Sequence, residues 1–162
     1  MGREPQGRAQ RVDNVSYDRQ EDPNAKRGVI GANGDFGKDY VLGLKDELRD
    51  NYGKMVVSES SYKSGVPTVD CQVVAIKTSN PDIFVNIGTP KFAAQAIKKV
   101  AELDWHPVHM MTNVSASAGA VLNPAGLDNP KGLLSAGYRL DVPDPRWHSP
   151  PGMPTFLPFL AR

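Results

Sequence analysis

Between residues 28 and 138, short apolar runs alternate with amphipathic segments, and this alternation constrains the fold more than any other feature of the sequence. The apolar runs predict strands over residues 29–30, 55–59, 82–87 and 108–111, and a fifth over 133–138. Apolar residues at helical spacing predict helices over residues 37–50, from 68 onward, and over 90–103, with a short helix after the fourth strand. Strands that alternate with helices of this length indicate an α/β fold in which a mostly parallel sheet is covered on both faces.

The starts of the second and third helices carry specific signals. Thr68 is placed to cap the second helix, with Asp70 in its first turn, where the helix dipole favours a negative charge. Thr89 is placed to cap the third helix, and Pro90 then occupies the first helical position, where its missing N–H is harmless. This third helix is expected to bury Ala93, Ile97, Val100 and Ala101.

The two ends of the chain lack this alternation. Residues 1–27 contain almost no aliphatic side chains and are expected to form an extended or disordered arm. Residues 28–140 form the predicted domain, and residues 141–162 form a tail whose many prolines are incompatible with a long helix or a central strand. Residues 1–26 are polar and lack the apolar segment of a signal peptide. The chain as written is therefore expected to carry no export signal and to stay in the cytoplasm if expressed in that form.

Composition excludes several classes of function. Charged residues make up 23% of the chain and the formal net charge is +1, so no electrostatic footprint for nucleic acid or an anionic membrane is present. No apolar run approaches the ~20 residues that span a bilayer. Cys71 is the single cysteine, which excludes an internal disulfide and a Cys-rich zinc module. We expect its thiol to pack against the sheet.

The glycine-rich turn after the first strand does not match a phosphate-binding motif. Glycines at every third position contain no G-x-G, and Gly37-Lys38-Asp39 lacks the hydroxyl residue of a P-loop. The kinase-like triplet Asp35-Phe36-Gly37 has no catalytic loop upstream of it. The turn is better interpreted as facing a ligand crevice, because α/β sheets bind ligands at the carboxyl ends of their strands.

Other reactive residues do not assemble into a recognisable active site. His106 and His109 have a spacing that could suit a metal, but solvated loop histidines are the favoured interpretation. Ser115 and Ser117 lack the G-x-S-x-G pattern of a nucleophile elbow. The paired carboxylates Glu47 and Asp50 are expected on a solvated helix face. We therefore predict no catalytic residue, no metal and no cofactor.

Residues 29–153 resemble the middle segment of type I periplasmic binding proteins of the branched-chain amino acid (leucine/isoleucine/valine) family, the solute receptors of ABC importers. The resemblance rests on short motifs whose order and spacing agree: DFGKDY from Asp35, GLKD from Gly43, SY at Ser61, PTVD from Pro67, DIF from Asp82, TPKFAAQAI from Thr89, AEL from Ala101, VSAS from Val114, PAGL from Pro124, KG at Lys131, DPRW from Asp144 and PGM from Pro151.

The resemblance implies a three-layer, Rossmann-like (flavodoxin-like) lobe that is not an enzyme. Such receptors have two lobes that close on a small solute, and this chain resembles the second lobe only. Carried over by position, the solute contacts follow the first, third and fourth strands: Asp35, Phe36, Thr89, Pro90, Phe92, Asn113, Val114 and Ser115. The implied solute is an amino acid or a similar organic acid, and the implied partners are a first lobe and an ABC permease. The resemblance implies a periplasmic location for the binding protein. The exposed crevice face could also pair two copies in a homodimer.

Two features separate this chain from the family pattern. Gly31-Ala32-Asn33-Gly34 replaces the usual tyrosine and acidic or amide residues, and the pattern is lost at both ends. A truncated gene product that binds its solute weakly or not at all on its own would explain both. The alternatives are a flavodoxin-like protein that binds flavin or a nucleotide, and the sensor domain of a receptor, because α/β folds host many functions.

Overall fold

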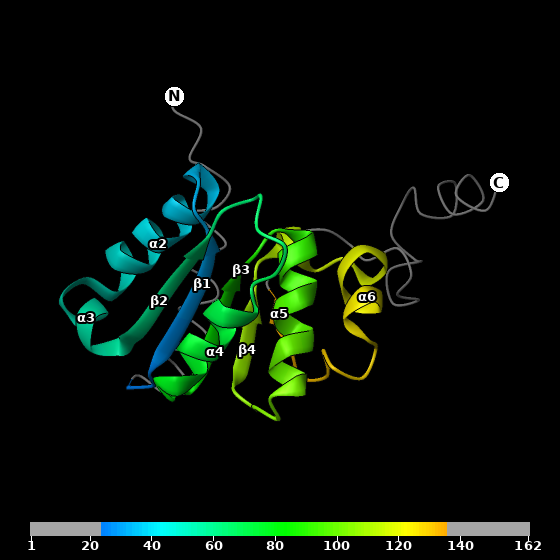
Figure 1. Ribbon diagram of the computed structural model, residues 1–162. Coiled ribbons are helices and arrows are strands. Elements are labelled where there is room, and N and C mark those ends of the chain that lie inside the picture. The colour runs from blue at the N-terminus through cyan, green and yellow to red at the C-terminus, as the bar shows by residue number, and fades with distance from the viewer. Residues whose placement is uncertain (1–23, 136–162) are drawn as a thin grey trace, which may run out of the picture.

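The computed structural model describes residues 24–135 (Figure 1). The predicted proline-rich tail lies outside the described residues, and so do the first 23 residues of the predicted arm. Within residues 24–135, five parallel strands form one sheet: β1 (Arg27–Ala32), β2 (Val56–Tyr62), β3 (Ile83–Ile87), β4 (Val108–Met111) and β5 (Leu134–Ser135). Their order is β2-β1-β3-β4-β5. The predicted parallel α/β sheet is therefore confirmed. The last three positions of the predicted fifth strand, 136–138, lie outside the described residues.

Helices connect consecutive strands. The long ones are α2 (Asp35–Leu48), α4 (Asp70–Thr78) and α5 (Pro90–Glu102). Shorter turns are η1 (Arg49–Asn51), α3 (Tyr52–Met55), η2 (Asn113–Ser115), the π-helical turn η3 (Ala118–Leu122) and α6 (Asn123–Ala125). Each predicted helix has a counterpart among these elements.

Helices lie on both faces of the sheet (Figure 1). Alternate residues of the strands pack against these opposite layers. Val29 of β1 packs with Leu44 and Leu48 of α2 on one face, whereas the adjacent Ile30 packs with the α4 and α5 cluster on the other. A third cluster joins α5 to η3 and α6 beyond β4. Because helices cover both faces, β1 and β3 read as nearly continuous apolar runs, as buried parallel strands do.

Helix starts follow the sequence signals in part. Thr89 is the N-cap of α5, with an extended backbone, and Pro90 opens the helix. The predicted cap at Thr68 is wrong, because Val69 is the N-cap of α4 and its side chain is fully buried in the core. Burial of Val69 moves the start of the helix by one residue.

Two side chains predicted to be buried are exposed. Cys71 lies on the solvent side of α4, because the buried Val73 is two positions on, about 200° around the helix. Ala101 is exposed because α5 buries Ile97 and Val100, and the next position turns 100° away from that face.

Candidate functional site

The strand order creates a switch point between β1 and β3. The chain leaves β1 toward β2 at one edge of the sheet, and it leaves β3 toward β4 on the other side. The two following helices, α2 and α5, lie on opposite faces, so the loops that lead into them diverge. In open α/β sheets, ligands bind in the crevice that such diverging loops leave at the carboxyl ends of the strands. The predicted contact residues all belong to loops or helix starts at the carboxyl ends of the strands, which we call the switch-point edge.

The loop after β1 is held to the end of β2. The backbone N–H of Asn33 donates to the carbonyl of Tyr62 at 2.7 Å. Asp35 is exposed in the first turn of α2, and Phe36 is half-buried with its ring edge-on to Tyr40, 5.2 Å between centroids. One edge of Phe36 is therefore available to a ligand, while the rest of the ring belongs to the packing of α2.

The loop after β3 is also organised by Tyr62. The backbone N–H of Thr89 donates to the phenol oxygen of Tyr62 at 2.9 Å, and the two hydroxyls lie 3.5 Å apart. Thr89 and Pro90 are half-buried, whereas Phe92 is only 5% exposed and packs on the Tyr62 ring at 4.4 Å. Phe92 therefore lies in the core behind Tyr62.

The loop after β4 forms the turn η2 and is tied to β3. Ser115 is fully buried, and its hydroxyl donates to the carbonyl of Gly88 at 2.6 Å. Val114 projects outward with 48% of its surface exposed, and Asn113 is half-buried. Ser115 thus fixes the relative positions of the two loops, and its neighbours present the accessible surface.

The structure therefore brings the predicted residues to one edge of the sheet, at three different depths. Asp35 and Val114 are exposed; Phe36, Thr89, Pro90 and Asn113 are half-buried; Phe92 and Ser115 are buried. Two residues at this edge were not predicted. Tyr62 was missed because the predicted second strand ended at residue 59, and Thr112 was missed although it directly follows a predicted strand. The Thr112 hydroxyl is buried and has no hydrogen-bond partner within residues 24–135.

A groove of about 350 Å³ opens at the same edge, between α2 and the edge strand β2. Gly31, Ala32 and Asn33 line one side of it, and Ser60 and Ser61 line the other. Most of its lining surface is apolar, and Val41 and Leu42 of α2 contribute to it. The unusual glycine-containing segment after β1 therefore contributes concave surface at the edge where ligands bind in this fold class.

Below this edge, a buried polar network links β3 to β4. The amide oxygen of Asn86 accepts from the Gly88 N–H at 3.0 Å, and its amide nitrogen lies 3.3 Å from Nε2 of His109. Burial lowers the pKa of His109 to about 4, so the ring is neutral at pH 7. The expectation of a solvated His109 is wrong, because the residue lies within β4 with 8% exposure.

His106 is the exposed histidine of the pair, 3.6 Å from Asp104. The two histidines therefore differ fully in environment. Within the described part of the chain, no cluster of three or more His, Cys, Asp or Glu side chains could hold a metal ion. No helix of residues 24–135 has the length and apolar character needed to cross a membrane.

The sequence profile of the periplasmic binding proteins matches residues 10–146. The chain belongs to the periplasmic binding protein family. The match begins well before residue 29 and ends before residue 153, so the resemblance extends into the predicted arm and stops short of the Pro151-Gly152-Met153 motif. Family members bind solutes, and they act in the periplasm or outside the cell. A search of curated protein sequences finds no match to this chain.

Solved structures confirm the fold. A substrate-binding periplasmic protein from Ralstonia solanacearum superposes with a TM-score of 0.75 at 19% identity, covering 93% of this chain and 41% of the other. A periplasmic binding protein type 1 from Bordetella pertussis Tohama I has a TM-score of 0.69 at 24% identity, covering 81% of this chain and 34% of the other. A branched-chain amino acid ABC transporter protein from Thermus thermophilus, with bound valine, has a TM-score of 0.72 at 18% identity, covering 83% of this chain and 35% of the other. This chain spans about a third to two-fifths of the length of these structures.

Proposed function

We propose that the described residues form the second solute-binding lobe of an ABC-transporter substrate-binding protein, and that its solute is an amino acid or a similar small organic acid. The observation that carries the proposal is that the loops after β1, β3 and β4 all lie at the carboxyl ends of the strands around the switch point, in a chain of this family. The valine bound by the Thermus thermophilus neighbour supports an aliphatic amino acid as the first solute to test.

The residues at this edge take different roles according to their depth. Asp35, Thr89 and Asn113 are the accessible polar groups that would hydrogen-bond a solute. Phe36, Pro90 and Val114 supply the apolar contacts that small-molecule sites use for most of their surface.

The two buried residues act through their neighbours. Phe92 supports the Tyr62 ring that holds the loop after β3, and Ser115 holds the Gly88 carbonyl. Both are positioning residues in this proposal. Their substitution should change the arrangement of the loops before it removes any contact with the solute.

The described lobe provides one wall of the crevice. The family's solute receptors close two lobes around their ligand, so the partners proposed here are a first lobe that supplies the opposite wall and an ABC permease that receives the solute. A second copy of this chain is the other candidate for the opposite wall, and sedimentation of the chain with and without solute distinguishes the two arrangements.

Amide NMR of the full chain tests the site directly. Leucine is titrated to tens of millimolar, and we expect chemical-shift changes at the amides of residues 33–36, 88–89 and 112–115. Asn113→Ala should reduce these changes. Lys54→Ala, just before β2 at the opposite edge of the sheet, is the matched control and should leave them unchanged. Shifts confined to the opposite edge, or no shifts at saturating leucine, would contradict the proposed site.

A further inference from the structure

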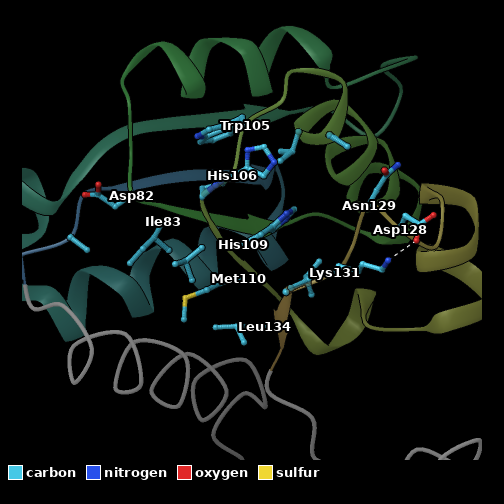
Figure 2. Close-up of a pocket in the computed structure, with 17 residues that line it drawn as sticks. Asp82, Ile83, Trp105, His106, His109, Met110, Asp128, Asn129, Lys131 and Leu134 are labelled. Atoms are coloured by element: carbon cyan, nitrogen blue, oxygen red, sulfur yellow. Dashed lines mark ion pairs between the residues drawn. The ribbon is translucent and has the colours of Figure 1, made fainter.

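A second and larger cavity lies at the opposite end of the sheet from the crevice. It has a volume of about 740 Å³ and opens where β3, β4 and β5 begin (Figure 2). Trp105, His106 and His109 lie on one side, the loop at Lys131 borders it, and Met110 and Leu134 lie on the other side. This volume is within the range of sites that hold small organic ligands. The proposed solute contacts play no part in it.

The hydrogen bonds of Asn86 determine which nitrogen of His109 carries the proton. The Gly88 N–H donates to the Asn86 amide oxygen, so the Asn86 NH₂ group must face His109. An NH₂ group can only donate, and therefore Nε2 of His109 is the acceptor and Nδ1 carries the hydrogen. In an imidazole ring the two nitrogens point away from each other. The Nδ1–H is thus a donor directed away from Asn86, on a ring that lines the cavity.

No residue within 24–135 accepts a hydrogen bond from this donor, and Nδ1 is not among the fully buried polar atoms that lack a partner in this part of the chain. The nitrogen is therefore reachable from the cavity, although the His109 side chain as a whole is only 8% exposed. A ligand that offers one acceptor at this point would satisfy the Nδ1–H.

The wall next to His109 is aromatic. The Phe84 ring lies 4.8 Å from His109 and 5.2 Å from Trp105, so the three rings form one continuous group. Trp105 is half-buried and lines the cavity, which exposes part of its indole to a ligand. Flat apolar molecules pack favourably on such a surface.

The charges around the cavity favour a neutral ligand. Lys131 is exposed and paired with Asp128 at 2.8 Å, and His106 is exposed. The buried ring of His109 is itself uncharged. An anion that bonded to it would lose its hydration while facing an uncharged donor, which is unfavourable.

We propose that this cavity is a second binding site, specific for small neutral aromatic carbonyl compounds. The carbonyl oxygen accepts a hydrogen bond from Nδ1–H of His109, and the aromatic ring packs against Trp105. The site is independent of the crevice, so it stands whether or not the crevice binds amino acids.

Acetophenone and ethylbenzene test the proposal as a matched pair of probes. They share size and ring, but only acetophenone has an acceptor. In NMR titrations of the full chain, we expect acetophenone to shift the His109 Nδ1 and Trp105 indole resonances. We expect it to bind about fivefold more tightly than ethylbenzene, the ratio that one net hydrogen bond provides. Equal affinities for the two probes, or acetophenone shifts that avoid Trp105 and His109, would overturn the proposal.

Variants separate this cavity from the crevice. His109→Phe removes the donor while it keeps a ring of similar size, and it should abolish the preference for acetophenone over ethylbenzene. Asn113→Ala, at the crevice, should leave both affinities unchanged. A preference that survives in His109→Phe contradicts the assignment. If this variant does not fold, the comparison of the two probes on the unaltered chain still decides the question.

Discussion

At the scale of single residues, Asn86 has the most consequential position. It is fully buried in β3, and its amide satisfies both the Gly88 N–H and His109. Asn86→Leu has a similar volume but would leave both of these groups buried without a partner. We expect the free energy of unfolding, measured by urea denaturation at pH 7, to fall by about 2–4 kcal/mol.

Thr112→Val is the matched control for Asn86→Leu, because Thr112 is buried nearby and its backbone N–H bonds to the Asn86 carbonyl. Its hydroxyl has no partner within the described residues. Removing a buried hydroxyl that makes no hydrogen bond should change stability by less than about 1 kcal/mol, or increase it. A large loss in Thr112→Val would show that the hydroxyl has a partner, such as bound water.

His109 should make stability depend on pH in a defined window. Its pKa is about 4 in the folded chain and about 6.5 when unfolded, so between these values the unfolded chain binds more protons. Stability is therefore complete above about pH 6.5 and falls as the pH drops toward 4, by about 3 kcal/mol in all. Urea denaturation of the native chain and of His109→Phe, from pH 7.5 to 4.5, measures this. The His109→Phe variant should lose this contribution to the pH dependence; parallel curves for the two proteins would contradict the prediction.

At the scale of elements, the approach of α2 to β1 depends on Gly37. A Cβ at this position would collide with the backbone carbonyl of Ala32, which cannot move without disturbing the end of β1. Gly37→Ala should therefore destabilise the fold by more than about 2 kcal/mol, as overpacking against a fixed group does. Thermal unfolding followed by circular dichroism measures the loss, and we expect the loop after β1 to lose its arrangement with it.

Gly53→Ala is the control for Gly37→Ala. Gly53 also lies in a helix, but a Cβ there meets nothing within 4 Å. Alanine has the higher helix propensity, so this variant should be neutral or more stable by up to about 1 kcal/mol. If both glycine variants lose stability equally, the cause is not the contact with Ala32.

The elements themselves were predictable because each strand and helix has a strong local pattern. The apolar run at 82–87 predicted β3, and the Thr89-Pro90 signal predicted the start of α5, each to within one residue of the observed boundary. Burial within an element was less predictable. Cys71 of α4 and Ala101 of α5 each lie close in sequence to buried positions of the same helix. Only the rotation of each packed helix about its axis determines which positions face the sheet.

The site was predictable to the level of its loops. Parallel strands bring their carboxyl ends to one edge, so residues after β1, β3 and β4 had to be neighbours. Depth within that edge depends on long-range contacts. Phe92 packs behind Tyr62, and Ser115 reaches the carbonyl of Gly88, 27 residues away. No local pattern encodes either contact, and the same is true of the Asn86–His109 pair.

At the scale of the whole molecule, the chain spans about a third to two-fifths of the solved structures that share its fold. Its crevice residues lie on one edge, and exposed groups such as Asp35 and Val114 face outward from it. A ligand held by one wall keeps much of its surface in water, whereas typical small-molecule sites bury most of it. Affinity for leucine should therefore be low, with a dissociation constant of roughly 1 mM or weaker.

Thermal unfolding with added leucine measures this affinity. At 1 mM leucine, a dissociation constant of about 1 mM stabilises the folded chain by about 0.4 kcal/mol, so the melting temperature should rise by about 1–3 °C. Isoleucine should act similarly, and lysine, whose side chain is charged, should have no effect. A rise of more than about 10 °C at 1 mM would require a dissociation constant of about 100 μM or tighter. Sedimentation velocity would then show whether a second copy supplies the opposite wall, because only in that arrangement does leucine convert monomer to dimer.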